Sequence, residues 1–194
     1  MNSKFIILLF FTFSVNALCQ QKEEVFESAA VVSARKEASE IGVAILKKGG
    51  NAFDAMVATE LSLAVCYPYA GNIGGGGFMV YRLNSGEIGS LDYREKAPAK
   101  ANEKMYLDAN NKIIPNLSIE GAMSVGIPGT IAGIFAVHEK FGTLSMQEIM
   151  QPVIVLAKKG VRVTEKEFIQ IESHKKTILK VSGNSNYLSA NYQV

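Results

Sequence analysis

The chain reads Lys47-Lys48-Gly49-Gly50-Asn51-Ala52-Phe53-Asp54 at the point where one predicted helix ends and a second begins. Upstream of this stretch, Ser33 precedes a segment, residues 34–48, whose apolar side chains recur every three to four positions. A hydroxyl group at the N-cap, lysines in the last turn and a glycine directly after it are typical of the two ends of a helix. We therefore predict an amphipathic helix over residues 34–48, capped by Ser33.

The second helix is predicted over residues 52–65, with Asn51 as its N-cap. Asp54 stands where a carboxylate can meet the free N–H groups of the first turn. The segment AFDAMVATELSLAV is apolar on most sides. Because such a helix has no polar face to present to solvent, we expect it to lie buried between layers of the fold.

Two extended runs follow the helical pair. Residues 78–83 and 88–93 flank the turn signal Asn84-Ser85-Gly86. Residues 78–93 therefore predict a β-hairpin, and residues 108–112 predict a further polar turn.

Three more helices are expected after the hairpin. Pro128 opens one that runs to Phe141, before Gly142, and Ser145 with Glu148 forms a capping box for one that runs to Lys159 and can kink at Pro152. Thr164 with Glu167 repeats the capping-box pattern. This order of elements favours helices packed on a largely antiparallel sheet over a doubly wound sheet.

The N-terminus has the composition of a secretory signal peptide. Residues 1–19 carry one charge, Lys4, then a short apolar run and small residues around Ala17 and Cys19. The apolar run is well short of the roughly 20 residues that span a bilayer, so we expect no stable membrane span. We expect cleavage after Ala17 or Cys19 and export to a periplasm or the extracellular space. A lipoprotein modification of Cys19 is the alternative.

Composition bounds the class of protein. The chain has 194 residues, of which 48% are hydrophobic and 20% charged, and its formal net charge is +2. This apolar content supports a packed core, and the length is in the range of one domain. Because 20 Lys and Arg are balanced by 18 Asp and Glu, the chain lacks the basic excess that binding to a phosphate backbone requires. We expect no nucleic-acid partner.

Cysteine use indicates neither a disulfide framework nor a metal site. If Cys19 leaves with the signal peptide, Cys66 is the cysteine that remains, and it follows apolar residues. We interpret Cys66 as a small buried side chain rather than a nucleophile. The sequence has no CxxC or Cys/His metal-ligand spacing, so we expect no cofactor.

Four successive glycines, residues 74–77, are the most conspicuous local feature. They match neither a dinucleotide fingerprint nor a phosphate loop, because the spacing differs, a strand follows and no Gly-Lys-Ser/Thr closes the run. The run allows very close approach of another backbone or of a ligand. Ser124 does not fit the GxSxG pattern, and His138 and His174, both flanked by charges, are predicted to be solvated surface residues.

Arg94 is a stronger candidate for binding. It stands where the second extended run leaves the predicted sheet. A guanidinium group can hold a carboxylate with two parallel hydrogen bonds. From the residues alone, a salt bridge to Asp92, Glu95 or a more distant acid is the competing interpretation.

Four stretches of the sequence, taken together and in this order, are specific enough to indicate a family: GGNAFDA (49–55), GGGGF (74–78), DYREKAP (92–98) and VGIPGT (125–130). Two shorter segments follow them, Gln151-Pro152 and LAKKG (156–160). In order and spacing they resemble the γ-glutamyltransferase (γ-glutamyltranspeptidase, glutathione hydrolase) family. The resemblance runs from about residue 31 to at least residue 163.

This resemblance implies an α+β fold of the N-terminal-nucleophile hydrolase type, an αββα sandwich, of which the chain holds only part. Family members are inactive precursors that cut themselves into a large and a small subunit. The new N-terminal threonine of the small subunit attacks the γ-glutamyl carbonyl of glutathione, with its own amine able to act as base. Water, or an acceptor amino acid or peptide, then resolves the acyl-enzyme.

The resemblance assigns one functional residue of the family to a position in this chain. Arg94, in its Arg-Glu-x-Ala-Pro setting, matches the arginine that binds the α-carboxylate of the glutamyl substrate. The nucleophilic threonine and the other catalytic groups of the family lie on the small subunit, so we assign no catalytic residue in this chain. We expect residues 74–77 to pack near the active centre. Asn72 stands where we expect a smaller residue.

The resulting interpretation is a signal peptide at residues 1–19, followed by the N-terminal part of the large subunit at residues 20–194, an incomplete domain and roughly the first third of a precursor. We expect this part to be inactive by itself and not to fold stably, because half of a sandwich exposes sheet edges and an apolar face. The alternatives are a related cephalosporin or glutaryl acylase on the same fold and a catalytically inactive binding fragment.

Overall fold

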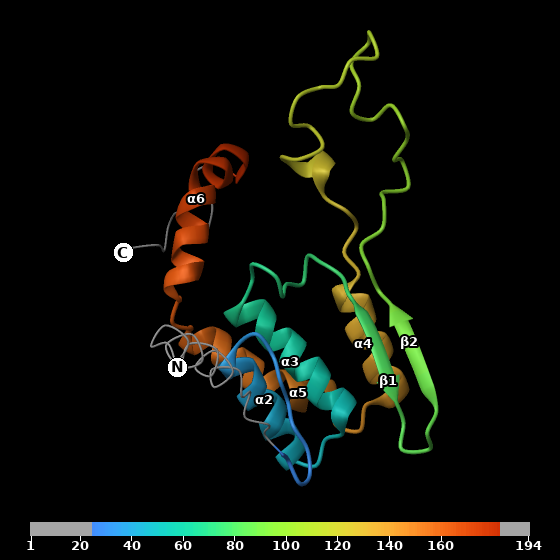
Figure 1. The fold of residues 1–194 in the computed structure, drawn as a ribbon, viewed down its shortest axis with the longest axis vertical. Coiled ribbons are helices and arrows are strands. Elements are labelled where there is room, and N and C mark those ends of the chain that lie inside the picture. Colours follow the sequence, from blue (N-terminus) through green and yellow to red (C-terminus); the bar gives the residue numbers. More distant parts are fainter. Residues whose placement is uncertain (1–24, 183–194) are drawn as a thin grey trace, which may run out of the picture. The chain divides into compact units, whose positions relative to one another are not determined.

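The computed structural model describes residues 25–182, and the expected signal peptide lies outside them. The elements below belong to one compact unit, which begins at residue 31. They are α2 (Lys36–Lys47), α3 (Ala52–Cys66), β1 (Phe78–Arg82), β2 (Ile88–Asp92), the 3₁₀ turn η1 (Ala122–Ser124), α4 (Thr130–Phe141), α5 (Met146–Lys159) and α6 (Glu165–Ser182) (Figure 1).

The predicted first helix is present as α2, but its start was predicted wrongly. The N-cap is Arg35, and the Ser33 hydroxyl donates to the Arg35 carbonyl, 2.8 Å away, instead of accepting from the first turn. The end matches the prediction. Gly49, with φ of 99°, and Gly50 donate to the carbonyls of Leu46 and Ile45, which is a Schellman motif that closes the helix.

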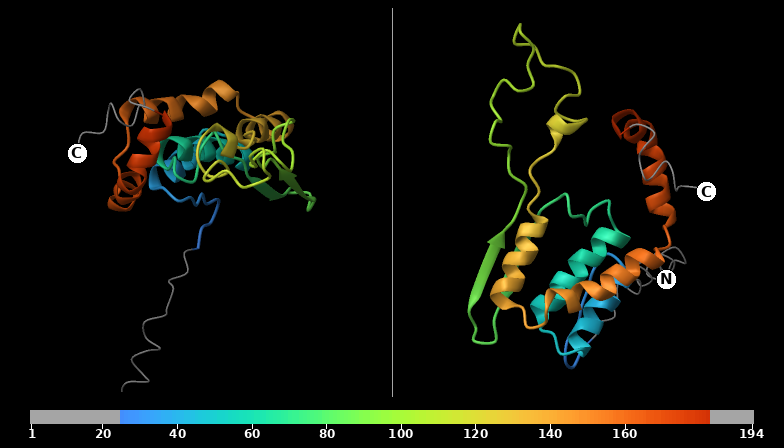
Figure 2. Two further views of the ribbon diagram at one scale, coloured as in Figure 1. Left: turned by 90° about the horizontal axis from the view of Figure 1, so that it is seen from above. Right: turned by 180° about the vertical axis from the view of Figure 1, so that it is seen from behind.

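The predicted second helix is confirmed as α3, and it lies between α2 and α4 with α5 packed across it (Figure 2). Asn51 accepts from the N–H groups of Phe53 and Asp54, and Asp54 accepts from the N–H of Asn51. This capping box fixes the start of the helix. The core surrounds α3 and is formed by Ile45, Ala55, Val57, Ala58, Ile134, Val137 and Ile149.

The predicted hairpin is confirmed as an antiparallel pair in which Phe78 faces Asp92 and Arg82 faces Ile88. Alternate side chains point inward. Met79 and Leu91 pack on the core, and Tyr81 contacts the rings of Phe53 and Phe141. The hairpin therefore covers the α3–α4 side of the helical layer (Figure 1).

The later helices follow their capping signals, with one shift. α4 begins at Thr130 rather than Pro128, because Ile127 is held in an extended bridge to Lys96 and the N–H groups of Gly129 and Thr130 bind outside the helix. The capping boxes of α5 and α6 form as predicted, and α5 continues through Pro152. The polar turn at residues 108–112 is confirmed by a 2.8 Å hydrogen bond from the Asp108 N–H to the Lys112 carbonyl.

Residues 25–182 thus form a mostly helical structure with one two-stranded sheet. The expected sandwich is present here only in part. Among the same residues, no helix has the length and apolar character needed to cross a membrane.

Candidate functional site

The glycine run packs directly against the backbone that carries Arg94. A Cβ atom built on Gly76 would lie 2.6 Å from the Tyr93 carbonyl oxygen and 2.7 Å from the Arg94 Cα atom. Gly77 exchanges two backbone hydrogen bonds with Tyr93, which extends the β1–β2 ladder by one pair. Of the two interpretations left open by the sequence, close backbone packing is therefore correct for Gly76 and Gly77.

The start of α4 joins the same junction. The carbonyl oxygen of Gly75 accepts from the N–H groups of Gly129 (2.8 Å) and Thr130 (3.1 Å). The Thr130 hydroxyl donates to the Asn72 carbonyl, 3.2 Å away, so Asn72 contacts α4 through its backbone carbonyl rather than through its side chain. Three stretches that are far apart in sequence, residues 72–77, 93–96 and 127–130, therefore meet at one place.

The side chain of Arg94 points away from this packed junction and is 62% exposed. Its Nε atom lies 3.6 Å from a carboxylate oxygen of Glu95, and its guanidinium carbon lies 5.6 Å from the centre of the Phe78 ring. An exposed ion pair of this length is worth at most about 1 kcal/mol. Asp92 binds the backbone N–H of Arg94 rather than its side chain. The guanidinium group therefore keeps its paired donors accessible to a carboxylate ligand.

Tyr93 and Glu60 are site residues that the sequence analysis missed. The Tyr93 hydroxyl donates to the Glu60 carboxylate, with oxygen–oxygen distances of 3.1 and 3.4 Å. Burial raises the pKa of Glu60, and the hydrogen bond from Tyr93 only partly opposes this. Burial, together with the neighbouring Glu60 carboxylate, raises the pKa of Tyr93 to about 12. No motif links residues 33 positions apart, so the sequence carried no signal for this pair.

The remaining candidates take no part in this junction. Cys66 is buried, as predicted, and burial raises the pKa of its thiol, which disfavours the reactive thiolate. The Ser124 hydroxyl donates to the Gly121 carbonyl. His174 is exposed as predicted, but His138 is half-buried, with its Nε2 atom 2.8 Å from the Leu144 carbonyl oxygen. The prediction of a solvated His138 is wrong, because the α4–α5 turn folds back over its ring.

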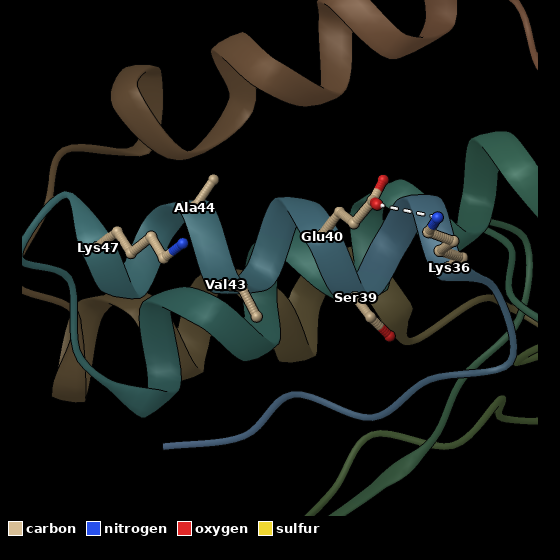
Figure 3. Close-up of a pocket in the computed structure, with 6 residues that line it drawn as sticks. All are labelled: Lys36, Ser39, Glu40, Val43, Ala44 and Lys47. Carbon is tan, nitrogen blue, oxygen red and sulfur yellow. Dashed lines mark ion pairs between the residues drawn. The ribbon is translucent and has the colours of Figure 1, made fainter. Parts of the chain in front are cut away.

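A separate hollow of about 310 Å³ lies along α2 (Figure 3). It is lined by Lys36, Ser39, Glu40, Val43, Ala44 and Lys47. The Lys36 ammonium group lies 3.6 Å from the Glu40 carboxylate in an exposed pair. All of these residues come from one helix, so the hollow does not bring polar groups from different elements together. Within residues 25–182, no group of three or more His, Cys, Asp or Glu side chains could hold a metal ion.

Comparison with known proteins shows the family of the chain. Residues 38–193 match the family model described as Gamma-glutamyltranspeptidase. A glutathione hydrolase proenzyme of Pseudomonas sp. (strain A14) is 44% identical over 165 residues, which cover 85% of this chain and 29% of that relative. The chain therefore spans less than a third of the length of this curated relative.

Solved structures agree with this match. The crystal structure of Helicobacter pylori gamma-glutamyltranspeptidase superposes with a TM-score of 0.79 at 41% identity and covers 83% of this chain and 46% of that chain. A cephalosporin acylase from Bacillus halodurans, at 22% identity and a TM-score of 0.65, covers 83% of this chain and 31% of that chain, and shows a common fold alone. The extent of the family match and the agreement with a solved member together show that the chain belongs to the gamma-glutamyltranspeptidase family.

Proposed function

We propose that this chain is the N-terminal part of the large subunit of an exported γ-glutamyltransferase. The complete enzyme would hydrolyse glutathione, or transfer its γ-glutamyl group to an amino acid or peptide, through an acyl-enzyme on a threonine of the small subunit. Support comes from the family match and from the glutathione hydrolase proenzyme of Pseudomonas sp. (strain A14), of whose length this chain spans 29%. The partners of this chain would be a γ-glutamyl substrate, an acceptor and the small subunit of the same precursor.

The observation that carries the proposal is the exposed guanidinium group of Arg94 beside the packed glycine junction. The α-carboxylate of a glutamyl substrate is a planar anion that fits two parallel N–H donors. In this assignment Arg94 binds and orients the substrate, and the bond-breaking steps belong to groups outside this chain. The Phe78 ring, whose centre lies 5.6 Å from the guanidinium carbon, supports the group from one side.

The experiment compares the complete gene product with its Arg94→Lys variant, using glutathione and a γ-glutamyl anilide as substrates. Lysine keeps the charge but loses the paired donors, so KM should rise about tenfold or more while kcat changes less. Arg82→Lys is the matched control, since Arg82 is exposed at the opposite end of β1. An unchanged KM in Arg94→Lys would remove Arg94 from the substrate site.

A related acylase is the second candidate, and the likeness to the cephalosporin acylase fold is the observation in its favour. An acylase of that kind would cleave a glutaryl amide, which keeps the terminal carboxylate of a γ-glutamyl group but lacks its α-amino group. We expect faster cleavage of the γ-glutamyl anilide than of the glutaryl amide. The reverse preference would favour the acylase.

Export is the remaining part of the proposal, and the composition of residues 1–19 supports it. Mass spectrometry of the protein recovered outside the cytoplasm should find a mature N-terminus after Ala17 or Cys19. Recovery of the whole N-terminal segment from the cytoplasm would contradict export.

A further inference from the structure

Tyr93 is the inward-facing neighbour of Arg94. Its ring lies against two positions without side chains, Gly77 in the glycine run and Gly133 in α4. A Cβ atom built on Gly77 would lie 2.8 Å from the ring, and one on Gly133 would overlap it. The ring therefore occupies a slot that the two glycines leave open between β1 and α4.

The hydroxyl end of the ring reaches α3. There it donates to the Glu60 carboxylate at 3.1 Å, and Glu60 is half-buried. Because burial disfavours an unpaired carboxylate, this hydrogen bond stabilises both partners. Tyr93 is thereby tied to three elements: to the hairpin through its main chain, to α4 through its ring and to α3 through its hydroxyl group.

Arg94, by contrast, has little to hold its own side chain. Glu95 at 3.6 Å and Phe78 at 5.6 Å are exposed contacts that solvent competes with. The position of the guanidinium group therefore depends on where the main chain at residues 93–94 is held. Successive residues of an extended chain point to opposite faces, so fixing the Tyr93 ring on the inner face fixes the outward direction of Arg94.

We propose that Tyr93 and Glu60 form an anchor that positions Arg94 for the substrate carboxylate. Both are positioning residues, since they act through Arg94 and do not touch the ligand. The inference rests on the proposed function, in which Arg94 binds the α-carboxylate of a γ-glutamyl substrate.

The test uses the complete gene product and a γ-glutamyl anilide. Tyr93→Phe keeps the ring in its slot and removes the hydrogen bond, and Glu60→Leu breaks the same bond without altering Tyr93. We expect each to raise KM about threefold to tenfold, the worth of one hydrogen bond, with kcat within about twofold. Glu60→Gln keeps an acceptor oxygen for the hydroxyl group, so it should restore KM to near the unaltered value.

A double variant separates positioning from a general loss of structure. In an Arg94→Lys background the paired donors are already lost, so adding Tyr93→Phe should raise KM little further, whereas independent effects would multiply. Tyr106→Phe is the matched control, since the Tyr106 hydroxyl donates to the Met123 carbonyl in the loop away from this junction, and it should leave KM unchanged.

The outcomes distinguish the two proposals. If Arg94→Lys raises KM but Tyr93→Phe and Glu60→Leu do not, the anchor is wrong and the proposed function stands. Multiplicative effects in the double variant, or a Glu60→Gln variant as impaired as Glu60→Leu, would also overturn the anchor. If Arg94→Lys itself leaves KM unchanged, the assigned role of Arg94 fails and the anchor fails with it.

Discussion

The carboxylate of Asp54 accepts hydrogen bonds from both the backbone N–H and the hydroxyl group of Thr143, at 3.1 and 2.5 Å. The same carboxylate accepts from the N–H of Asn51, and the Asn51 amide donates to the Phe141 carbonyl. Asp54 is fully buried. One acid thus closes the first turn of α3 and ties it to the turn between α4 and α5.

Replacing Asp54 with Asn should destabilise the protein. The amide keeps the volume of the carboxylate, but its NH₂ group would face N–H and O–H donors that need an acceptor. Leaving such groups unpaired in the interior costs about 2 to 4 kcal/mol. Thermal unfolding of the complete gene product should show the lower midpoint. Thr143→Ser keeps the hydroxyl donor and should stay close to the unaltered protein, so equal losses in the two variants would contradict this assignment.

The contribution of Asp54 should depend on pH. Burial acts to raise the pKa of Asp54, but hydrogen bonds from Thr143 and Asn51 outweigh it and hold the pKa below its ordinary value of 3.8. A carboxyl group with a lowered pKa in the folded state stabilises above its ordinary pKa, and the benefit is lost as pH falls through the folded value. The difference in unfolding midpoint between the unaltered protein and Asp54→Asn should therefore be constant above about pH 5 and shrink below the ordinary pKa. A difference that grows on acidification would contradict this.

The start of α6 depends on a second acid. Glu167 closes the Thr164 capping box, and both of its carboxylate oxygens accept from the Nη1 atom of Arg35, at 2.6 and 2.8 Å. The side chains of Arg35 and Glu167 are 10% and 11% exposed. Glu167→Gln should cost about 1 to 3 kcal/mol, because the shielded Arg35 guanidinium group would then face a neutral amide in place of a carboxylate. Hydrogen exchange at the first turn of α6 should accelerate. Glu40→Gln, in the exposed pair with Lys36, is the control and should change stability by less than about 0.5 kcal/mol.

The outer face of the hairpin gives a prediction for the isolated chain. Phe78, Val80 and Ile88 are 64%, 78% and 70% exposed there. An apolar sheet face of this kind needs a covering layer. We expect residues 20–194, expressed alone, to show no cooperative thermal transition and to bind a hydrophobic dye. A sharp transition without dye binding would contradict this.

The sequence predicted the elements well where the signal was local. The Asn51, Ser145 and Thr164 caps each depend on side chains within three residues, and all three formed. The predicted Ser33 cap did not form, because the Ser33 hydroxyl is hydrogen-bonded to the Arg35 carbonyl and to the Ser39 hydroxyl instead. The start of α4 shifted because the Gly75 carbonyl, more than 50 residues away, captures the N–H groups before the helix begins.

The candidate site could be predicted only in part for the same reason. Arg94 was found because its motif is contiguous in sequence. The residues that surround Arg94 come from α3, the glycine run and the start of α4. A single sequence does not show which of these distant segments are in contact. In the sequence, Glu60 is one of the few polar positions on a helix that is predicted to be buried. Its pairing with Tyr93 is evident only from the hydrogen bond between the Tyr93 hydroxyl and the Glu60 carboxylate in the structure.

Gly76→Ala should disrupt the site far more than Gly74→Ala. At Gly76 the added methyl group would meet the Tyr93 carbonyl oxygen at 2.6 Å and the Arg94 Cα and Glu95 nitrogen at 2.7 Å. All three are backbone atoms, so no change of rotamer can relieve the overlap. At Gly74 the nearest atom is the Asn72 side-chain oxygen at 3.3 Å, which can move.

We therefore expect Gly76→Ala to cost about 1 to 3 kcal/mol of stability by overpacking and to raise KM for a γ-glutamyl anilide, because the shifted backbone carries Arg94. Gly74→Ala should stay within about 0.5 kcal/mol with KM unchanged. Neither glycine has a positive φ, so the comparison isolates crowding from backbone conformation. Unfolding midpoints and KM of the two variants in the complete gene product provide the measurement. Equal effects at the two positions would mean that close approach at Gly76 is not what holds Arg94 in place.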